Sequence, residues 1–227
     1  MDDDSAGHGT YLTVPVFPLP NVVLFPKTFL PLHIFEMRYR AMVGDALACD
    51  KLIAMTLLKD GWETSQESEP PVFQIACVGK IKQSEKLEIG RYNLLLYGLY
   101  KVRLLTIQPS APYRSAEVEV LRDIAPVPDH EKQHRESLMQ LARKLMPGRV
   151  SSLIEDISLL DEMDYESLVN TLAMAASLPM HRKQELLELE SIDRRAEFLI
   201  TFMEQLADIR EFFQTLPYIT PNDPHDN

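Results

Sequence analysis

Residues 14–40, VPVFPLPNVVLFPKTFLPLHIFEMRYR, constrain the fold of this chain more than any other stretch. Five of the 16 prolines lie here among Val, Leu, Phe and Ile, and the stretch has no glycine. Proline lacks a backbone N–H and favours extended geometry in itself and in the preceding residue. The proline-bearing part therefore cannot be a helix, or a central strand paired along its full length. We expect short extended pieces at 14–17, 22–25 and 29–32, broken at prolines, at a sheet edge or around a core.

The remainder of the first half carries mostly strand patterns. Apolar residues recur at helical spacing from Phe35 to Leu47, which predicts one amphipathic helix. Gly90 suits a hairpin connection, and Gly98 suggests a bulge or a sharp bend. Runs rich in Val, Ile, Leu and Tyr predict strands at 51–58, 72–83, 92–100, 102–108 and 114–121. The first half is therefore predicted to be mainly β, with one helix inserted early.

The segment 125–129, APVPD, marks a change from strands to helices. Asp129 is positioned to cap a helix that Pro147 and Gly148 would end. Strands followed by helices give the α+β class. The predicted organisation is a disordered tail, a β-barrel subdomain, a helical-bundle subdomain and a loose tail, with the bounds 1–10, 11–124, 129–216 and 217–227.

Three further helices are predicted after this point. They lie at 165–177, where Asp164 can cap the start, at 181–189, and from Ser191 onward. The last helix is apolar on two faces, so we expect it to pack against more than one neighbour as the spine of a helical bundle. Its two stripes are Ile192, Ala196, Leu199, Met203 and Leu206, and Phe198, Phe202, Ile209 and Phe212.

Three phrases of the sequence, in this order, resemble the substrate-binding domain of the ATP-dependent Lon proteases. The first is PVFPLPNVVLFP…LPLHIFEMRYRAMV, the second is VGKIKQSEKLEIGRYNLLLYGLYKVR at 78–103, and the third is QELLELESIDRRAEFLITFM near the C-terminus. The resemblance spans roughly 11–210. It implies a PUA-like β-barrel (the type of pseudouridine synthases and archaeosine transglycosylases) followed by a helical bundle. It also implies binding of protein substrates and a part in assembly.

Composition argues against several functional classes. With a net charge of −11, the chain is poorly suited to neutralise nucleic-acid phosphates or to dock on an anionic membrane. The acidic start MDDDSAGHG is unlike a signal peptide, and no apolar run reaches the roughly 18 residues of a membrane span. Cys49 and Cys77 are too few for a disulfide framework or a four-thiolate zinc site. We expect a cytoplasmic protein with no cofactor and no nucleic-acid or membrane partner.

One short motif is typical of metal chemistry, the H-E-x-x-H pattern formed by His130, Glu131, Lys132, Gln133 and His134. In zinc peptidases the two histidines hold Zn²⁺ on one helix face while the glutamate activates the bound water. Here Lys132 adds a positive charge, the position after a proline-rich boundary is predicted to face solvent, and only Glu155 or Asp156 can be nominated as a third ligand. We favour an exposed helix start and keep a zinc-dependent hydrolase as an alternative.

Other catalytic patterns do not occur in the sequence. It has no G-x-x-x-x-G-K-[ST] phosphate loop, no G-x-S-x-G elbow and no G-x-G-x-x-G fingerprint. The resemblance to Lon covers only the substrate-binding domain, and not the ATPase and peptidase modules of that family. We therefore predict a protein that is not an enzyme.

Four aromatic residues are candidates for contact with a partner. Phe25, Phe29 and Phe35 lie among prolines that stiffen the backbone, which lowers the entropy lost on binding. Trp62 lies in a polar loop. Burial in the core is the competing interpretation for each of them. The predicted function, by resemblance, is a non-catalytic module that binds proteins or unfolded polypeptide segments, with self-association left open. An RNA-binding PUA-like module is a further alternative, which the negative charge opposes.

Overall fold

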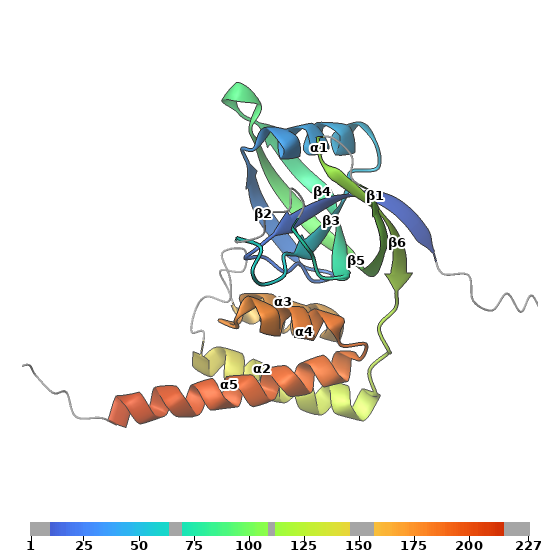
Figure 1. Cartoon of the computed structure of the whole chain (residues 1–227). Helices are drawn as coiled ribbons and strands as arrows, with labels where there is room; N and C mark the ends of the chain where they lie inside the picture. The colour runs from blue at the N-terminus through green and yellow to red at the C-terminus, as the bar shows by residue number, and fades with distance from the viewer. Residues whose placement is uncertain (1–9, 64–69, 109–111, 146–156, 216–227) are drawn as a thin grey trace, which may run out of the picture.

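The computed structural model describes residues 10–63, 70–108, 112–145 and 157–215. It places a β-barrel on two layers of helices (Figure 1). The layer next to the barrel holds α3 and α4, and the layer farther away holds α2 and α5. The bounds of these helices are Pro128–Leu145 for α2, Tyr165–Ala175 for α3, Met180–Glu188 for α4 and Ile192–Thr215 for α5. The predicted tails, apart from Thr10, and the predicted helix end at Pro147–Gly148 lie outside the described residues.

One sheet of six strands forms the barrel, in the order β2-β5-β4-β3-β1-β6. Strand β6 also pairs with β5, which closes the sheet and leaves β2 paired with β5 alone. The strands are β1 (Tyr11–Leu19), β2 (Phe29–Ile34), β3 (Leu52–Leu57), β4 (Ile75–Lys86), β5 (Tyr92–Gln108) and β6 (Arg114–Leu121). A closed β-sheet followed by helices confirms the predicted α+β class.

Strand β1 shows how the prolines are accommodated. It pairs with β6 through Tyr11–Val16 and with β3 through Val16–Leu19, so that only Val16 has partners on both sides. This confirms that the stretch is no central strand paired along its full length, because proline cannot donate to a ladder. The predicted breaks at Pro18 and Pro31 are wrong, since β1 continues through Pro18 and β2 continues through Pro31. Residues 22–25 form no strand, although Val23, Leu24 and Phe25 are buried.

Strand β5 is a single long strand where the sequence predicts two. Its first part pairs with β2 and β4, and its last part pairs with β4 and β6. The register with β4 shifts beside Gly98, which confirms the predicted bulge. The hairpin from β4 to β5 turns at Glu88–Gly90, where Gly90 has φ of +74°. Glycine adopts such a positive φ without the steric cost that a side chain brings.

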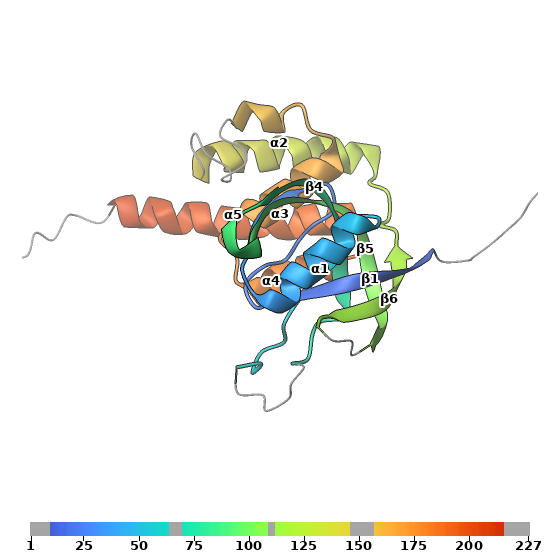
Figure 2. The same ribbon diagram turned by 90° about the horizontal axis from the view of Figure 1, so that it is seen from above.

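Helix α1 (Met37–Ala48) closes the end of the barrel that faces away from the other helices (Figures 1 and 2). It begins two residues after Phe35, where the apolar periodicity starts. Its buried residues Tyr39, Met42, Val43 and Ala46 pack against the barrel core that includes Phe17, Leu30 and Ile53. The single helix predicted among the strands is thus α1, which covers one end of the barrel.

The helix starts follow the predicted caps in part. Asp164 accepts a hydrogen bond from the Ser167 backbone N–H at 3.1 Å and caps α3 as predicted. Asp129 is not a cap, because α2 already begins at Pro128 and Asp129 lies in its first turn. A proline is well suited to that position, since it has no N–H to leave unsatisfied. Among the described residues no helix has the length and apolar character that a membrane crossing requires.

The Asp164 cap gives a prediction for stability. Replacing Asp164 with alanine should lower the free energy of unfolding by about 1 kcal/mol, because the first N–H groups of α3 lose their acceptor. Burial alone would raise the pKa of Asp164, but hydrogen bonds from Ser167 and Lys27 lower it overall. The charged cap therefore stabilises the fold well above pH 3.8, the ordinary value, and its contribution falls as the pH drops below that value.

Urea unfolding followed by circular dichroism at pH 7 and near pH 3.5 measures both effects. Asp164→Asn is the matched control, because asparagine caps helices about as well as aspartate but does not titrate. It should retain most of the stability at pH 7 and lose the pH dependence that Asp164 contributes. An equal loss in Asp164→Ala and Asp164→Asn would show that the Lys27 ion pair, and not the cap, carries the stability.

The barrel and the helices share a core and a buried polar network. Val23, Phe25 and Leu57 of the barrel belong to the same apolar cluster as residues of α2, α3, α4 and α5. At its edge the guanidinium group of Arg195 is fully buried. It donates to Asn170 Oδ1 at 2.6 Å, to the Leu186 carbonyl at 2.9 Å, and to Asp123 Oδ2 and the Leu189 carbonyl at 3.1 Å. These bonds fix α5 against α3, α4 and the end of β6.

Candidate functional site

Helix α5 carries two apolar faces that have different surroundings. Leu206 of the first face is partly buried, and its other four residues are at most 2% exposed: Ile192, Ala196, Leu199 and Met203. The second face consists of Phe198, Phe202, Ile209 and Phe212, and the polar Gln205 lies on the same line. We call these five residues, spaced alternately four and three residues apart, the outer row. In this row Phe198 and Phe202 are partly buried, whereas Ile209 and Phe212 are 53% and 62% exposed. The prediction that α5 packs against more than one neighbour is confirmed, since it contacts α2, α3 and α4. The part of the second face that holds Ile209 and Phe212 nevertheless stays open.

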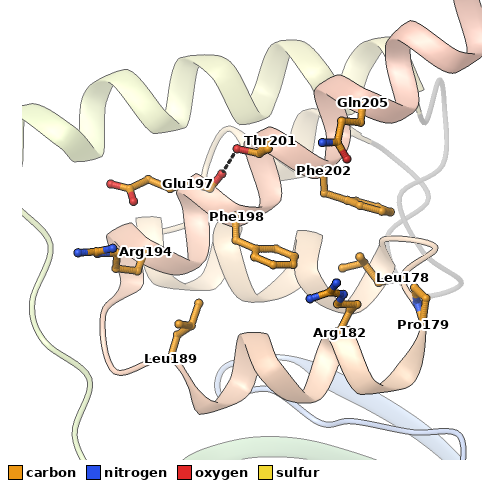
Figure 3. A pocket seen from close by; sticks show the side chains of 10 residues that line it. All are labelled: Leu178, Pro179, Arg182, Leu189, Arg194, Glu197, Phe198, Thr201, Phe202 and Gln205. Carbon is orange, nitrogen blue, oxygen red and sulfur yellow. Dashed lines mark hydrogen bonds between the residues drawn. The ribbon is translucent and has the colours of Figure 1, made fainter.

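A groove of about 660 Å³ runs between α4 and the outer row of α5. Figure 3 shows the rings of Phe198 and Phe202 projecting from α5 into the space above α4. Leu178 and Pro179 line it at the start of α4, and Leu189 lines it at the end. The polar lining residues are Arg182, Arg194, Glu197, Thr201 and Gln205.

Both walls of the groove are anchored from behind. On α4, Gln184 donates to the Ile75 carbonyl of the barrel at 2.9 Å, and the Lys183 ammonium donates to the Met174 carbonyl at 2.6 Å. Burial lowers the pKa of Lys183. On α5 the buried Arg195 holds the helix in place next to Arg194, which lines the groove. Because both walls are fixed before a ligand arrives, little ordering would be needed on binding.

The outer row continues beyond the groove along α5. Figure 1 shows this helix extending past the ends of α3 and α4. Ile209, Phe212 and Phe213 belong to the last two turns of α5 and are exposed. The rings of Phe212 and Phe213 meet edge to face with centroids 6.0 Å apart. Groove and extension together form one apolar surface of about 21 Å from Phe198 to Phe212, at the usual helical rise. Its groups can bind apolar side chains, and the groove adds two guanidinium groups and one carboxylate.

The four aromatic residues that the sequence predicts as contacts are not brought together. Phe25 is fully buried beneath Arg195, 5.9 Å from its guanidinium carbon, and belongs to the core. Phe29 is partly exposed on β2, with its ring centroid 4.8 Å from that of Tyr97. Phe35 is exposed between β2 and α1. Trp62 packs partly buried against the barrel. Only Phe29 and Phe35 thus present large exposed aromatic surfaces.

The H-E-x-x-H motif lies at the start of α2, but its two histidines differ. His130 is exposed, whereas His134 is largely buried, so the prediction of a wholly solvent-facing motif is wrong. His134 Nδ1 lies 2.9 Å from the Tyr165 hydroxyl, which donates to Asp193 Oδ1 at 3.2 Å. Burial raises the pKa of Tyr165, and the nearby negative charge of Asp193 raises it further, so this hydroxyl stays protonated.

Through these hydrogen bonds, His134 of the motif helps to hold the first turns of α2, α3 and α5 together. The second oxygen of Asp193 accepts from the Val127 N–H at 2.9 Å, just before α2. No three His, Cys, Asp or Glu side chains in the described parts of the chain are placed to hold a metal ion. Glu155 and Asp156, nominated from the sequence as third ligands, lie outside the described residues. The geometry of Glu131, His130 and His134 thus offers no reason to propose zinc.

Comparison with known families decides the identity of the fold. The model of the ATP-dependent protease La (LON) substrate-binding domain matches residues 13–205. The chain belongs to this family. The resemblance inferred from the proline-bearing stretch and the two later phrases is thereby confirmed.

Full-length Lon proteases are among its relatives. The Lon protease of Syntrophomonas wolfei is 26% identical over 211 residues, which are 90% of this chain and 25% of that protein. The Lon protease of Escherichia coli K12 is 27% identical over 207 residues, 87% of this chain and 25% of that protein. The chain therefore spans about a quarter of the length of the curated relatives it matches.

Solved Lon domains share the fold. The N-terminal domain of the Mycobacterium avium complex Lon protease superposes with a TM-score of 0.65 at 16% identity, over 85% of this chain and 98% of that one. A Lon N-terminal domain protein from Xanthomonas campestris gives 0.59 at 21% identity, over 85% and 99%. At these identities the likeness establishes the fold of the Lon substrate-binding domain and no particular site.

The α4 side of the groove is absent from the sequence-based candidates. Leu178, Pro179 and Leu189 flank a short helix, and nothing in their spacing indicates that they face an open space. The α5 side did carry a signal, because the second apolar stripe is visible in the sequence. The sequence predicts a covered face there, because apolar periodicity does not tell which neighbour, if any, covers a helix face.

Proposed function

We propose that this Lon substrate-binding domain is a non-catalytic module that binds polypeptide segments with exposed apolar side chains in the groove between α4 and α5. The observation that carries the proposal is the outer row of α5, where Phe198 and Phe202 line an open groove with anchored walls. Exposed apolar surface of this extent on a folded protein is typical of an interaction site. The family's description as a substrate-binding domain of a protease supports a polypeptide as the ligand.

The groove suits a flexible chain of mixed sequence. Its floor is apolar and non-directional, so it would accept various aliphatic and aromatic side chains. The rim supplies hydrogen-bonding groups, among them Gln205 and Arg182, that can satisfy the backbone of a bound segment. The acidic side chain of Glu197 at the rim, with the net charge of −11, opposes an RNA ligand at this surface.

A binding assay with one variant on each candidate surface tests the proposal. We expect Phe202→Ser to weaken the binding of a fluorescently labelled, permanently unfolded protein, such as reduced and carboxymethylated α-lactalbumin, by roughly 10–100-fold. This is the effect of removing one buried phenylalanine contact. Fluorescence anisotropy gives the dissociation constants, and circular dichroism verifies that the variant is folded.

Phe29→Ser is the matched control, because Phe29 is an exposed aromatic residue on the barrel, away from the groove. It should bind the probe as the wild type does. A loss of binding in Phe29→Ser but not in Phe202→Ser would move the site to the barrel. If the wild type itself had no affinity for the probe, the proposed function would fail.

A further inference from the structure

A second row of residues follows the outer row along α5, one position earlier in the sequence. Its members are spaced four, three, four and three residues apart, and we call them the acidic row: Glu197, Thr201, Glu204, Asp208 and Glu211. All except Thr201 are carboxylates. Residues at this spacing share one face of a helix, so an acidic stripe runs beside an apolar one over four turns of α5.

The acidic row is little compensated by the protein itself. Glu211 forms an ion pair with Lys144 of α2 at 3.2 Å. None of the ion pairs among the described residues involves Glu197, Glu204 or Asp208. Arg194, one turn before Phe198, stands at the Leu189 end of the groove, and Arg182 of α4 stands near Pro179 at the other end (Figure 3). Arg182 already forms an ion pair with Glu185 at 2.7 Å. Toward the end of α5 the apolar surface is bordered by negative charge.

The spacing of the two rows indicates the shape of the partner. Alternating steps of four and three residues are the repeat by which one helix packs its apolar seam against another helix. Charged residues beside such a seam determine which helix binds, because opposite charges across the interface stabilise the helix pair and like charges destabilise it. An apolar seam with an acidic border therefore fits an amphipathic helix whose apolar face is bordered by Lys or Arg.

The same charges argue against a second copy of this chain as the occupant. Two α5 helices meeting through their outer rows would bring two acidic rows close to the shared seam. Like charges at such positions are destabilising, and Arg194 lies one turn before Phe198, far along the helix from Glu204 and Asp208. Self-association through α5 is thus disfavoured by the sequence of the row itself.

We propose that the outer face of α5 docks a cationic amphipathic helix, with its apolar side chains on the outer row and its Lys or Arg side chains against Glu204 and Asp208. This inference rests on the proposed function and narrows it to a partner class. It identifies preferred segments as those that form such a helix when bound. Segments that are apolar but flanked by acidic residues are discriminated against.

Two synthetic peptides test this partner class. Both have the same heptad-spaced leucines, and they differ only in carrying lysine or glutamate beside the apolar face. By fluorescence anisotropy, the wild-type protein should bind the lysine peptide at least tenfold more tightly than the glutamate peptide. Raising the salt from 50 mM to 500 mM should shrink this difference, since exposed charges are screened.

The variant E204K/D208K distinguishes recognition of the peptide's charge from non-specific hydrophobic binding. It should prefer the glutamate peptide, while a control reversal on the opposite side of the molecule, E117K on β6, should leave the lysine preference intact. Equal binding of both peptides, or an unchanged preference in E204K/D208K, would overturn the inference.

The unfolded-protein probe distinguishes the two levels of failure. If neither peptide binds but the unfolded probe does, the inference fails and the proposed function stands. If neither the peptides nor the probe bind, both fail. Sedimentation equilibrium tests whether a second copy of this chain occupies the surface instead. A dimer of the wild type that is lost in I209E would overturn the proposal of a cationic helix in favour of self-association.

Discussion

Arg195→Met is expected to lower the free energy of unfolding by about 3–5 kcal/mol, the range observed when one partner of a buried ion pair is removed. The guanidinium group of Arg195 is fully buried and serves four acceptors from three parts of the chain. Methionine fills a similar volume but donates nothing. Asn170 and the carbonyl groups of Leu186 and Leu189 would lose a donor in the interior, where water cannot replace it.

Urea unfolding followed by circular dichroism and tryptophan fluorescence measures the change. Arg194→Met is the matched control, because Arg194 is the adjacent residue on the same helix and is exposed. It should change the stability by no more than about 0.5 kcal/mol, as is usual for surface substitutions. Similar losses in both variants would mean that the buried network does not hold the helices to the barrel.

The charge balance of this network explains why it is sensitive. Lys101 of β5, also buried, forms an ion pair with Asp123 and donates to the Leu189 carbonyl at 2.7 Å. Burial lowers the pKa of Lys101 although Asp123 opposes that shift. One carboxylate thus serves two buried cations, and carbonyl groups supply the remaining acceptors. Removing a single member leaves the others without the partners that their burial requires.

Gly98→Ala is expected to be the most destabilising single-methyl change in the barrel, with a loss of about 3 kcal/mol or more. A Cβ at this position would lie 2.1 Å from the Phe25 carbonyl oxygen, which is far inside van der Waals contact. That oxygen cannot move away easily, because it accepts a hydrogen bond from the Thr28 hydroxyl at 2.7 Å. The neighbouring backbone is also fixed, since Gly98 exchanges hydrogen bonds with Lys27 and Thr28.

Thermal and urea unfolding check this prediction, with Gly44→Ala as the control. Gly44 lies within α1, and a Cβ there would meet nothing within 4 Å. Alanine should therefore raise the stability by up to about 1 kcal/mol, the difference in helix propensity. A Gly98→Ala protein as stable as the wild type would show that the approach of residues 25–28 to β5 is looser than the structure indicates.

Much of the fold could be predicted from local patterns. The strand at 114–121 has the predicted bounds, and Asp164 caps α3 as its sequence context indicates. Both depend on interactions within a few residues. The joining of 92–100 and 102–108 into β5 could not be foreseen, because the strand bends at Gly98 and changes partners in the barrel instead of ending. Partner exchange depends on residues far away in the chain.

The site could be predicted less well than the fold. Aromatic residues beside prolines were candidates, yet Phe25 lies in the core and Phe29 on the barrel, while the groove lies between two helices of the second half. The H-E-x-x-H motif was equally uninformative. The sequence of the motif does not reveal that His134 hydrogen-bonds to Tyr165, or that Asp193 accepts from the Val127 N–H. Side chains that recur at helical spacing indicate a face, but not its environment.

The sequence alone determined that residues 14–40 run extended at their prolines, that helices follow strands, and that the chain belongs to the Lon substrate-binding family. The first two features follow from backbone geometry and apolar periodicity, which act residue by residue, and the third from the three matching phrases. Only the tertiary structure decided which apolar face of α5 is core and which is open. That choice depends on where α3 and α4 lie, because a helix face is buried by its neighbours and not by its own sequence.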